Sequence, residues 1–570
     1  MDGWLSTLGS DPGPGTHAAR LWISHRRQRD AALEAAAAAG IAGWLDPPLH
    51  YLSELRRLFG LDRPPIGILA GRLLLARHAT REAEARDLPA SNPDGGRFRA
   101  HMLDGLVGEL LAEGVAPDDL ATELAALTAD GTDGFVRVRD EWVVASYRAY
   151  LESLLRRELI DPRAIPAHVA RRIDEGGLPT ALRGARELHV YGPTSLHRRR
   201  GLYRALAAQS EVRVSVYLVA EPEASEWEEL TGDARTIESA PLPAPGVHRA
   251  TDALREVAEV ARRVKRLVVE GGCRPGDVAV VARSGREDTR RVHRALAEAG
   301  VPSTARLRTT LAEIPALRAL LGLFEAEAVG WDHRRLRAVG TSPYLGIGLD
   351  ARPVDVVAAR KRVSGLGAWR DALVELADAA RRRNPDGIMA ASAGAAAETV
   401  ARLATRIASL SGERSEKAWI ESTRAITAGD AFGFRRRLCR VAGGRHDVVR
   451  LDQRGVRALD ALLAEWRSLA EDRSPMPATQ WLDGLRRLLE TNDLVLSTPL
   501  EQGVQVLEAH EAALTSFPHV FVIHANDGEF PRTPRWSGVL SDDERRELAR
   551  GGLPLEHRAL TLRRERALWR

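Results

Sequence analysis

The spacing of apolar residues along this chain predicts short strands separated by long helices. β-type apolar runs occur at 21–24, 187–192, 212–218, 277–283, 504–507 and 520–523. Between them, apolar residues recur every three to four positions, as in amphipathic helices, most clearly at 251–269. Strands that alternate with helices predict an α/β protein built on parallel sheets.

Two long stretches, 61–185 and 316–498, have a helical pattern almost throughout. In the first, Trp142, Tyr147 and Tyr150 recur at helical spacing and are expected to pack in a core. In the second, the alanine-rich patch 390–397 is either a loop or the start of an alanine helix. The proline-containing segment 221–247 is expected to be a linker.

The segment 504–531 near the C-terminus organises the second half of the chain. Its second run, 520–523, is entirely apolar, which predicts a strand buried on both faces. The turn Asn526-Asp-Gly follows, and then Phe530-Pro531. Ser541 with Glu544 three residues later forms a capping-box pattern, which predicts a helix start.

These residues carry a resemblance to a known family. The segment 504–531 resembles motif V of the UvrD-like (superfamily 1) DNA helicases. Asn526-Asp-Gly-Glu-Phe-Pro followed by Leu540-Ser-Asp-Asp-Glu-Arg is more closely similar to the AddB-type subunit of bacterial helicase–nuclease complexes. The block 255–315, with its Gly300-Val-Pro, resembles the start of the second motor domain of these helicases.

The resemblance implies two RecA-like (P-loop NTPase-type) parallel-sheet domains, each with a mostly helical insertion. The first domain would comprise 1–60 and 186–245, with 61–185 inserted. The second would comprise 246–325 and 499–570, with 326–498 inserted. Residues 562–570 match the start of the motif VI helix, so the chain is expected to stop before the nuclease domain of the family, as a fragment or a disrupted gene would.

The nucleotide-binding motifs of the family are degenerate in this sequence. A P-loop needs a Lys after its second Gly to reach the phosphates. In the loop 9–16, Pro14 and Gly15 stand at those two positions, and no lysine precedes Lys265. Where the Asp-Glu pair of an active helicase would hold Mg²⁺ and activate water, this chain has Tyr191-Gly192. ATP and Mg²⁺ are therefore not expected as cofactors.

Five residues are candidates for ligand contacts. Arg283 matches the motif IV arginine that lies toward the nucleotide; a structural ion pair or a nucleic-acid phosphate contact is an equally open role. His510 matches the motif V His beside single-stranded DNA, but Ala513-Leu514 replaces the Lys-Gly of true helicases. A hydrogen-bonded loop His is the alternative. The run Arg198, Arg199 and Arg200 contacts DNA or is a solvated helix face.

The composition of the chain limits the cellular compartment that it suits and the kinds of metal or disulfide site that it can form. The net charge of +4 arises from 82 basic and 78 acidic residues, so the chain is not a polycation. Two cysteines cannot form a disulfide framework or a four-cysteine metal site. The resemblance implies that an iron–sulfur cluster is possible only in a missing C-terminal domain, where the family carries its PD-(D/E)xK nuclease and cysteines. No apolar run approaches the roughly 20 residues of a membrane span, and no signal peptide is evident, which favours a cytoplasmic protein.

The resemblance predicts a non-hydrolysing, helicase-like subunit of a DNA end-processing complex in double-strand break repair. It would bind or guide single-stranded or end-frayed DNA beside an AddA-like motor subunit, without ATPase or nuclease activity of its own. Two alternatives stay open. One is an ATP-dependent helicase with an unorthodox nucleotide site, and the other is a structural, partner-binding remnant without DNA contact.

Overall fold

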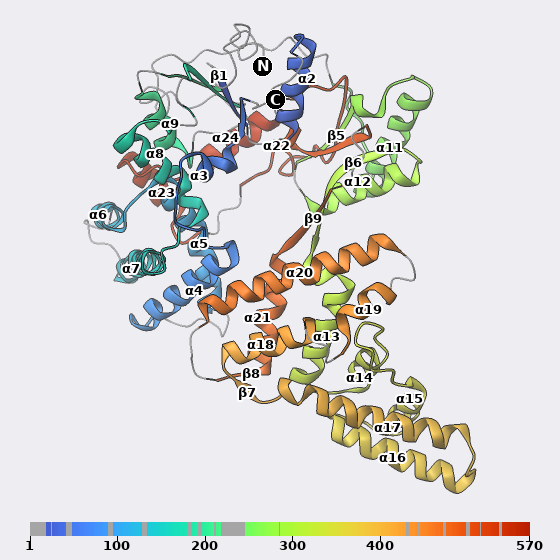
Figure 1. Cartoon of the computed structure of the whole chain (residues 1–570). Helices are drawn as coiled ribbons and strands as arrows, with labels where there is room; N and C mark the ends of the chain where they lie inside the picture. The colour runs from blue at the N-terminus through green and yellow to red at the C-terminus, as the bar shows by residue number, and fades with distance from the viewer. Residues whose placement is uncertain are drawn as a thin grey trace. The chain divides into compact units, whose positions relative to one another are not determined.

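The computed structural model describes residues 19–569 apart from 24–25, 42–47, 89–94, 128–133, 180–181, 183–184, 192–196, 210–211, 218–244, 284, 429–431, 442–444, 471–474, 498–501, 513–514 and 535–537. The chain forms an α/β structure with two compact units (Figure 1). The first unit comprises residues 1–307 and 497–570, and the second comprises 308–496. Among the described residues, no helix combines the length and apolar character needed to cross a bilayer.

The first sheet has four parallel strands in the order β2–β1–β3–β4. They are β1 (Ala19–Ile23), β2 (Leu49–Tyr51), β3 (Glu187–Tyr191) and β4 (Arg213–Tyr217). Trp22 and Val190 lie on the face that packs against α8 (Ile165–Gly176) and α9 (Arg200–Ala207). Ile23 lies on the other face, beside α2 (Arg26–Ala38). The strands expected at 21–24, 187–192 and 212–218 are confirmed.

Helices fill the stretch between β2 and β3. They are α3 (Leu55–Leu58), α4 (Ile68–Glu84), α5 (Gly95–Glu113), α6 (Pro117–Leu127), α7 (Gly134–Arg156) and α8. The three aromatic side chains expected in the core, Trp142, Tyr147 and Tyr150 of α7, are buried, at 3% exposure or less. Each polar end finds an acceptor: Trp142 donates to the Ala79 carbonyl at 2.7 Å and Tyr147 to the Val115 carbonyl at 2.9 Å. Core packing therefore accounts for these aromatics.

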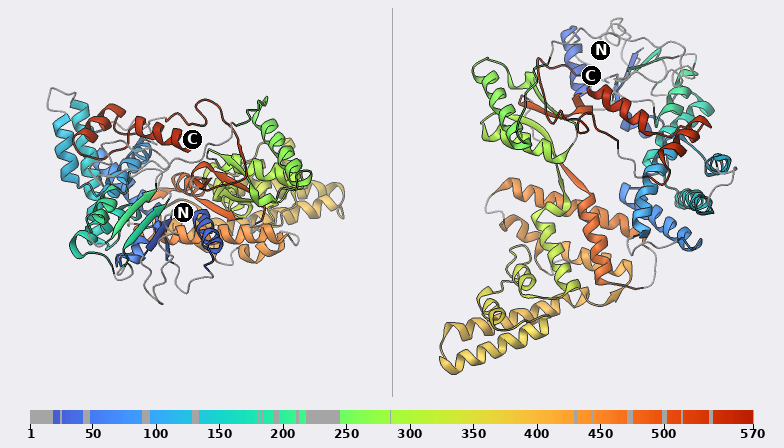
Figure 2. Two further views of the ribbon diagram at one scale, coloured as in Figure 1. Left: turned by 90° about the horizontal axis from the view of Figure 1, so that it is seen from above. Right: turned by 180° about the vertical axis from the view of Figure 1, so that it is seen from behind.

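The second sheet has five strands in the order β11–β5–β10–β6–β9. They are β5 (Val278–Ala282), β6 (Ser303–Thr310), β9 (Asp493–Ser497), β10 (Val504–Glu508) and β11 (His519–Val522). The pairs of β5 with β10 and β11, and of β10 with β6, are parallel. Valines of α11 (Ala253–Val269) and α12 (Arg286–Glu298) join those of β5 and β10 in one core. The two helices lie side by side in Figure 1 and again in the view from behind in Figure 2.

Gly503 illustrates how closely two strands of this sheet approach each other. It directly precedes β10, and a Cβ placed on it would lie 2.9 Å from the Ser303 Cα of β6. No real Cβ tolerates that distance to a backbone atom. A glycine is therefore required where β10 enters the sheet between β5 and β6.

The last segment returns to the second sheet through two helices, α23 (Asp542–Arg550) and α24 (Arg558–Trp569). The predicted capping box begins α23: the Glu544 amide donates to the Ser541 hydroxyl at 3.2 Å, and the Ser541 amide donates to the Glu544 carboxylate at 2.6 Å. Trp569 packs edge-to-face on the buried Phe530, with ring centroids 5.1 Å apart. Leu568 joins the core formed by β5 and β10. α24 thus packs against the second sheet.

The second unit is mostly helical; its described residues also include the end of β6, most of β9 and the small antiparallel pair β7–β8 (Glu413–Arg414 and Met476–Pro477). Its helices are α13 (Pro315–Val329), α14 (His333–Gly340), α15 (Ala351–Arg360), α16 (Leu366–Arg383), α17 (Ile388–Ile407), α18 (Glu416–Thr427), α19 (Phe434–Val441), α20 (His446–Leu469) and α21 (Ala478–Thr491). Trp481 stacks between Trp419 and Trp466 at centroid distances of 6.1 and 4.8 Å. α16 and α17 form the long hairpin drawn in yellow in Figure 1. The patch 390–397 lies inside α17, so the helical alternative is correct.

One expectation about the sheets is wrong. The run 520–523 was expected to be buried on both faces, but β11 is an edge strand, and Val520 and Val522 are 52% and 40% exposed. Only Ile523, just beyond the strand, is fully buried. An apolar run does not reveal whether a strand has neighbours on both sides, because its neighbours lie elsewhere in the sequence.

Candidate functional site

The end of β3 carries a neutral aromatic cluster where the resemblance places the catalytic carboxylates of a helicase. Tyr191 is the last residue of β3, and its ring stacks on Tyr217 with centroids 4.2 Å apart. The Tyr217 hydroxyl and His189 Nδ1 are 3.1 Å apart. Burial lowers the pKa of His189 despite the nearby Glu187, and burial together with the Glu187 charge raises the pKa of Tyr217. Both shifts favour the uncharged form of the side chain.

The connection after β1 is too short for a phosphate-binding loop. The P-loop motif spans eight residues, from its first Gly to its Ser or Thr, and most of them lie between the first strand and its helix. Here β1 ends at Ile23 and α2 begins at Arg26, which leaves two residues between them. The loop 9–16 precedes β1 instead of following it, and it lies outside the described residues, as does Gly192.

Arg283 follows β5 and forms an ion pair with Glu565 of α24. Two guanidinium nitrogens, Nε and Nη2, donate to the two carboxylate oxygens, the bidentate geometry that arginine favours. Glu565 also accepts the Arg532 amide at 3.2 Å, and its side chain is only 7% exposed. The sequence leaves three roles open for Arg283: a nucleotide contact, a nucleic-acid phosphate contact or a structural ion pair. In the structure Arg283 forms the ion pair.

His510 lies in a short helical turn, α22 (Ala509–Ala512), directly after β10. Its Nδ1 is 3.4 Å from the Glu508 carboxylate. The neighbouring Glu511 accepts from Arg306 at 2.9 Å and from the Glu508 amide at 3.2 Å. The histidine therefore lies among carboxylates. Ala513 and Leu514, which replace the Lys-Gly of true helicases, lie outside the described residues.

The arginine run at 198–200 precedes and begins α9. Arg198 adopts a left-handed backbone with φ of 68°, and its amide donates to Glu113. Its half-exposed guanidinium is within 4 Å of Glu109 and of Glu556. The Arg199 carbonyl accepts the Tyr203 amide at 3.0 Å, while Arg200 is the first residue of α9.

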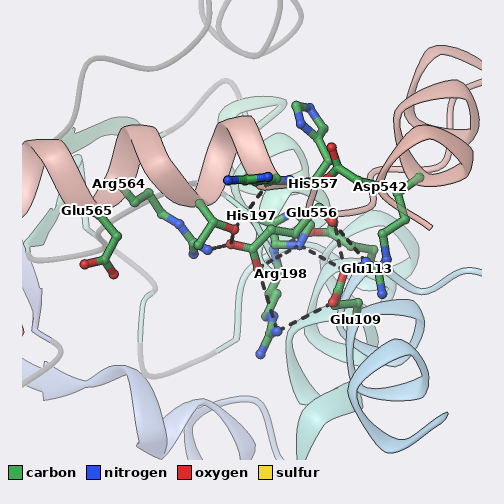
Figure 3. Close-up of polar contacts among 12 residues, drawn as sticks. Glu109, Glu113, His197, Arg198, Asp542, Glu556, His557, Arg564 and Glu565 are labelled. Atoms are coloured by element: carbon green, nitrogen blue, oxygen red, sulfur yellow. Dashed lines mark hydrogen bonds and ion pairs between the residues drawn. The ribbon is translucent and has the colours of Figure 1, made fainter. Parts of the chain in front are cut away.

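Arg198 belongs to a cluster of mostly buried charged side chains from three distant parts of the chain (Figure 3). We call it the carboxylate cluster; it comprises Glu109 and Glu113 of α5, His197 and Arg198 before α9, Arg545 of α23, and Glu556 and Arg564 at α24. Arg545 Nη1 donates to Glu109 at 2.9 Å and to the Glu556 carbonyl at 3.0 Å. The Glu556 amide donates to Glu109 at 3.1 Å. Buried charges of opposite sign thus join α5, α9 and the α23–α24 segment.

His197 lies at the centre of the cluster with three carboxylates around it. Its Nε2 is 3.6 Å from Glu109 and 3.9 Å from Glu556, and its Nδ1 is 3.8 Å from Glu113. The side chain is 7% exposed. Figure 3 shows that the carboxylates approach it from α5 and from the start of α24.

The two glutamates of α5 have opposite pKa shifts although they are one helical turn apart. Burial disfavours ionisation of Glu109, but the neighbouring His197 and the charges of Arg545 and Arg198 outweigh it and lower the pKa. At Glu113 burial dominates and raises the pKa, against the opposing effects of His197 and Arg198. Glu109 is therefore the more firmly ionised member of the pair.

α24 connects two of the predicted site residues. Glu565, which it carries, pairs with Arg283 at the second sheet, and Arg564, one position earlier, pairs with Glu556 in the carboxylate cluster that contains Arg198. In Figure 3, Arg564 extends toward Glu556, whereas Glu565 lies away from the cluster. The structure brings Arg283 and Arg198 to one helix, and α22 with His510 also lies against it.

His524 is a residue that the sequence analysis passed over. It follows β11 with a φ of 55°, a backbone region that residues other than glycine seldom adopt. Its amide donates to Glu256 at 2.9 Å, its Nε2 is 3.4 Å from the same carboxylate, and its Nδ1 is 3.4 Å from Asp288. These carboxylates lie in the first turns of α11 and α12, so His524 links the end of β11 to both helix starts. Nothing local in the sequence separates it from other loop histidines.

Within the described residues, no group of three or more His, Cys, Asp or Glu side chains is arranged to hold a metal ion. Cys273 and Cys439 are both free thiols. No protein-family model matches the chain, and no curated protein matches it.

Proposed function

We propose that the chain is a helicase-like module of a DNA end-processing complex, similar to the AddB-type subunits, that binds or guides single-stranded DNA without hydrolysing ATP. In this proposal its two parallel sheets are RecA-like domains, and the helices at 61–185 and 326–498 are their insertions. A separate motor subunit would supply the energy of ATP hydrolysis.

One observation carries the non-hydrolysing part of this proposal: the groups at the ends of β3 and β5 are neutral or already neutralised. Tyr191 stacks on Tyr217 where a magnesium-binding carboxylate would be needed. Arg283, the candidate for a phosphate contact, has its guanidinium engaged by Glu565. A site for ATP hydrolysis needs the opposite, namely a metal-binding carboxylate and cations available to phosphate.

ATP turnover in the presence of single-stranded DNA tests this part of the proposal. We expect no release of phosphate above the background of a protein-free reaction. Turnover that depends on both DNA and Mg²⁺ would instead support an ATP-dependent helicase with an unorthodox nucleotide site, and the non-hydrolysing module would be excluded.

The second candidate function is a structural, partner-binding remnant without DNA contact. The pairing of Arg198 with Glu109 and Glu556, and of Arg283 with Glu565, favours it, because phosphate would have to compete with these carboxylates. Co-purification with a motor helicase subunit, together with no crosslink to bound DNA, would support this alternative over the proposed one.

A further inference from the structure

A cavity of about 580 Å³ lies beside α8 in the helical stretch between β2 and β3. The segment 61–63 before α4, the end of α7 and the length of α8 line it. Its apolar lining consists of Leu61, Leu155 and Ile160. The volume is within the range of roughly 300–1,000 Å³ that small-molecule sites occupy.

Three arginines, Arg63, Arg171 and Arg172, line the same cavity. Many arginines of this protein pair with carboxylates, as Arg163 does with Asp161 at 2.8 Å. Within the described part of the chain, none of these three has a carboxylate within 4 Å. Arg171 Nη2 already contacts His168 Nδ1, and no carboxylate competes with an external anion for the three guanidinium groups within these described residues.

The remaining polar lining sets the charge of the cavity. Asp62 and Glu175 offset two of the three arginines, so one positive charge is left when His168 is neutral. His168 is neutral around pH 7 because burial, and then the charges of Arg171 and Arg63, lower the pKa of its imidazole. This charge suits a single phosphate better than a run of several phosphates.

We propose that this cavity binds one nucleoside monophosphate unit, with its phosphate at the arginines and its base against the apolar lining. Guanidinium groups match phosphate oxygens in fork geometry and also stack on planar rings, so the arginines can contact both parts of such a ligand. Leu61, Leu155 and Ile160 supply the apolar contact that inorganic phosphate would not use.

Two sources share this chemistry, a free mononucleotide and the phosphorylated end of a DNA strand. The strand-end source rests on the proposed function, because it requires that the chain meets DNA ends. The mononucleotide source does not require DNA binding. The two proposals can therefore fail separately.

The first test measures binding of AMP, adenosine and inorganic phosphate to the full chain by calorimetry. We expect AMP to bind more tightly than either part alone. Arg171→Gln and Arg63→Gln should each weaken AMP binding by about tenfold, the equivalent of one charge-assisted hydrogen bond. Arg294→Gln removes the same charge from an exposed arginine of α12 paired with Glu298, and should leave AMP binding unchanged.

The second test takes its readout from the wild-type protein, so a loss of folding in a variant cannot imitate the result. An NMR titration should show the His168 imidazole pKa rising when AMP is added and staying constant with adenosine, because phosphate places negative charge beside the ring. His168→Gln serves only to assign the resonance. An unchanged His168 pKa at saturating AMP would overturn the proposal.

The final test compares an oligonucleotide carrying a 5′-phosphate, one carrying a 3′-phosphate, and one without a terminal phosphate. Tighter binding of either phosphorylated strand, lost in Arg171→Gln, supports the strand-end source. Binding of AMP with no preference among the strands supports the mononucleotide source. Inorganic phosphate competing as well as AMP, or an acidic peptide binding where AMP does not, refutes the proposal.

Discussion

Replacing Arg545 by methionine should destabilise the packing of α23 and α24 more than any exposed charge change on the same helix. The guanidinium is 2% exposed and donates to the Glu109 carboxylate at 2.9 Å and to the Glu556 carbonyl at 3.0 Å. Met fills a similar volume but leaves the buried Glu109 without its closest cation. Breaking a buried pair in this way costs about 3–5 kcal/mol.

The neighbouring residue offers a matched control. Arg546 pairs with Asp542 at 2.5 Å, but its side chain is 45% exposed. Exposed pairs contribute at most about 1 kcal/mol, so Arg546→Met should cost no more than that. The two variants make the same chemical change one residue apart, and only the burial differs.

Hydrogen exchange measured by mass spectrometry on the α23 and α5 peptides is the suitable assay, because a chain with two units need not unfold in one step. We expect Arg545→Met to lose about 3 kcal/mol or more of protection in both peptides. The double variant Arg545→Met with Glu109→Gln should cost less than the sum of its single changes, because it leaves no unpaired charge. Equal losses in Arg545→Met and Arg546→Met would refute the reasoning.

Three further predictions follow from single contacts. Gly503→Ala should destabilise the second sheet by about 1–3 kcal/mol, because the added Cβ would lie 2.9 Å from the Ser303 backbone. Urea denaturation measures this loss, and an unchanged midpoint would contradict the close approach of the two strands. The pKa of Glu109 is lowered from 4.5, so its ionised form stabilises the folded chain above that pH. Glu109→Gln should therefore lower the free energy of unfolding by its full amount above pH 4.5 and by less below that pH. Denaturation of the variant and the wild type at several pH values between 7 and 3 measures this difference. Glu565→Gln should tighten single-stranded DNA binding, because it releases Arg283 from its ion pair. Anisotropy measures this binding, and a variant lacking an exposed glutamate of α12 is the control. Equal effects of the two changes would mean that only the net charge matters.

Elements with local hydrogen-bond or periodic patterns could be predicted from the sequence. The capping box of Ser541 and Glu544 needs only residues three positions apart, and it begins α23 as expected. The strand β5 and the helix α11 were likewise recognisable, because each carries its own apolar pattern. These predictions succeed because their causes lie within one or two turns of the chain.

Features that depend on distant partners could not be predicted. The exposed edge position of β11 follows from which strands lie beside it, and β6 (Ser303–Thr310) is too polar to be recognised before its neighbour β10 is known. The pair of Glu109 and Arg545 is separated by 436 positions, so nothing in either local sequence indicates it. His524 has a left-handed backbone, and its amide donates to Glu256, which lies 268 positions away.

The sequence and the contacts lead to different expectations for Arg283 and Arg198. The resemblance places Arg283 toward a nucleotide, and the positive charge of the run that contains Arg198 makes it a candidate for DNA contact, with a solvated helix face as the alternative. In the structure Arg283 faces Glu565 and Arg198 faces Glu109, and both carboxylates are largely buried. If the chain binds DNA, then either phosphate displaces these carboxylates or other cations make the contacts.

Equilibrium binding of single-stranded DNA, measured by anisotropy across a salt series, tests the central claim most directly. Binding that engages about four phosphates should weaken with a log–log salt slope of about −3, which is roughly a sixtyfold loss of affinity between 50 and 200 mM salt. The account predicts such a slope in the absence of ATP. Affinity that is negligible at low salt, or insensitive to salt, would contradict it.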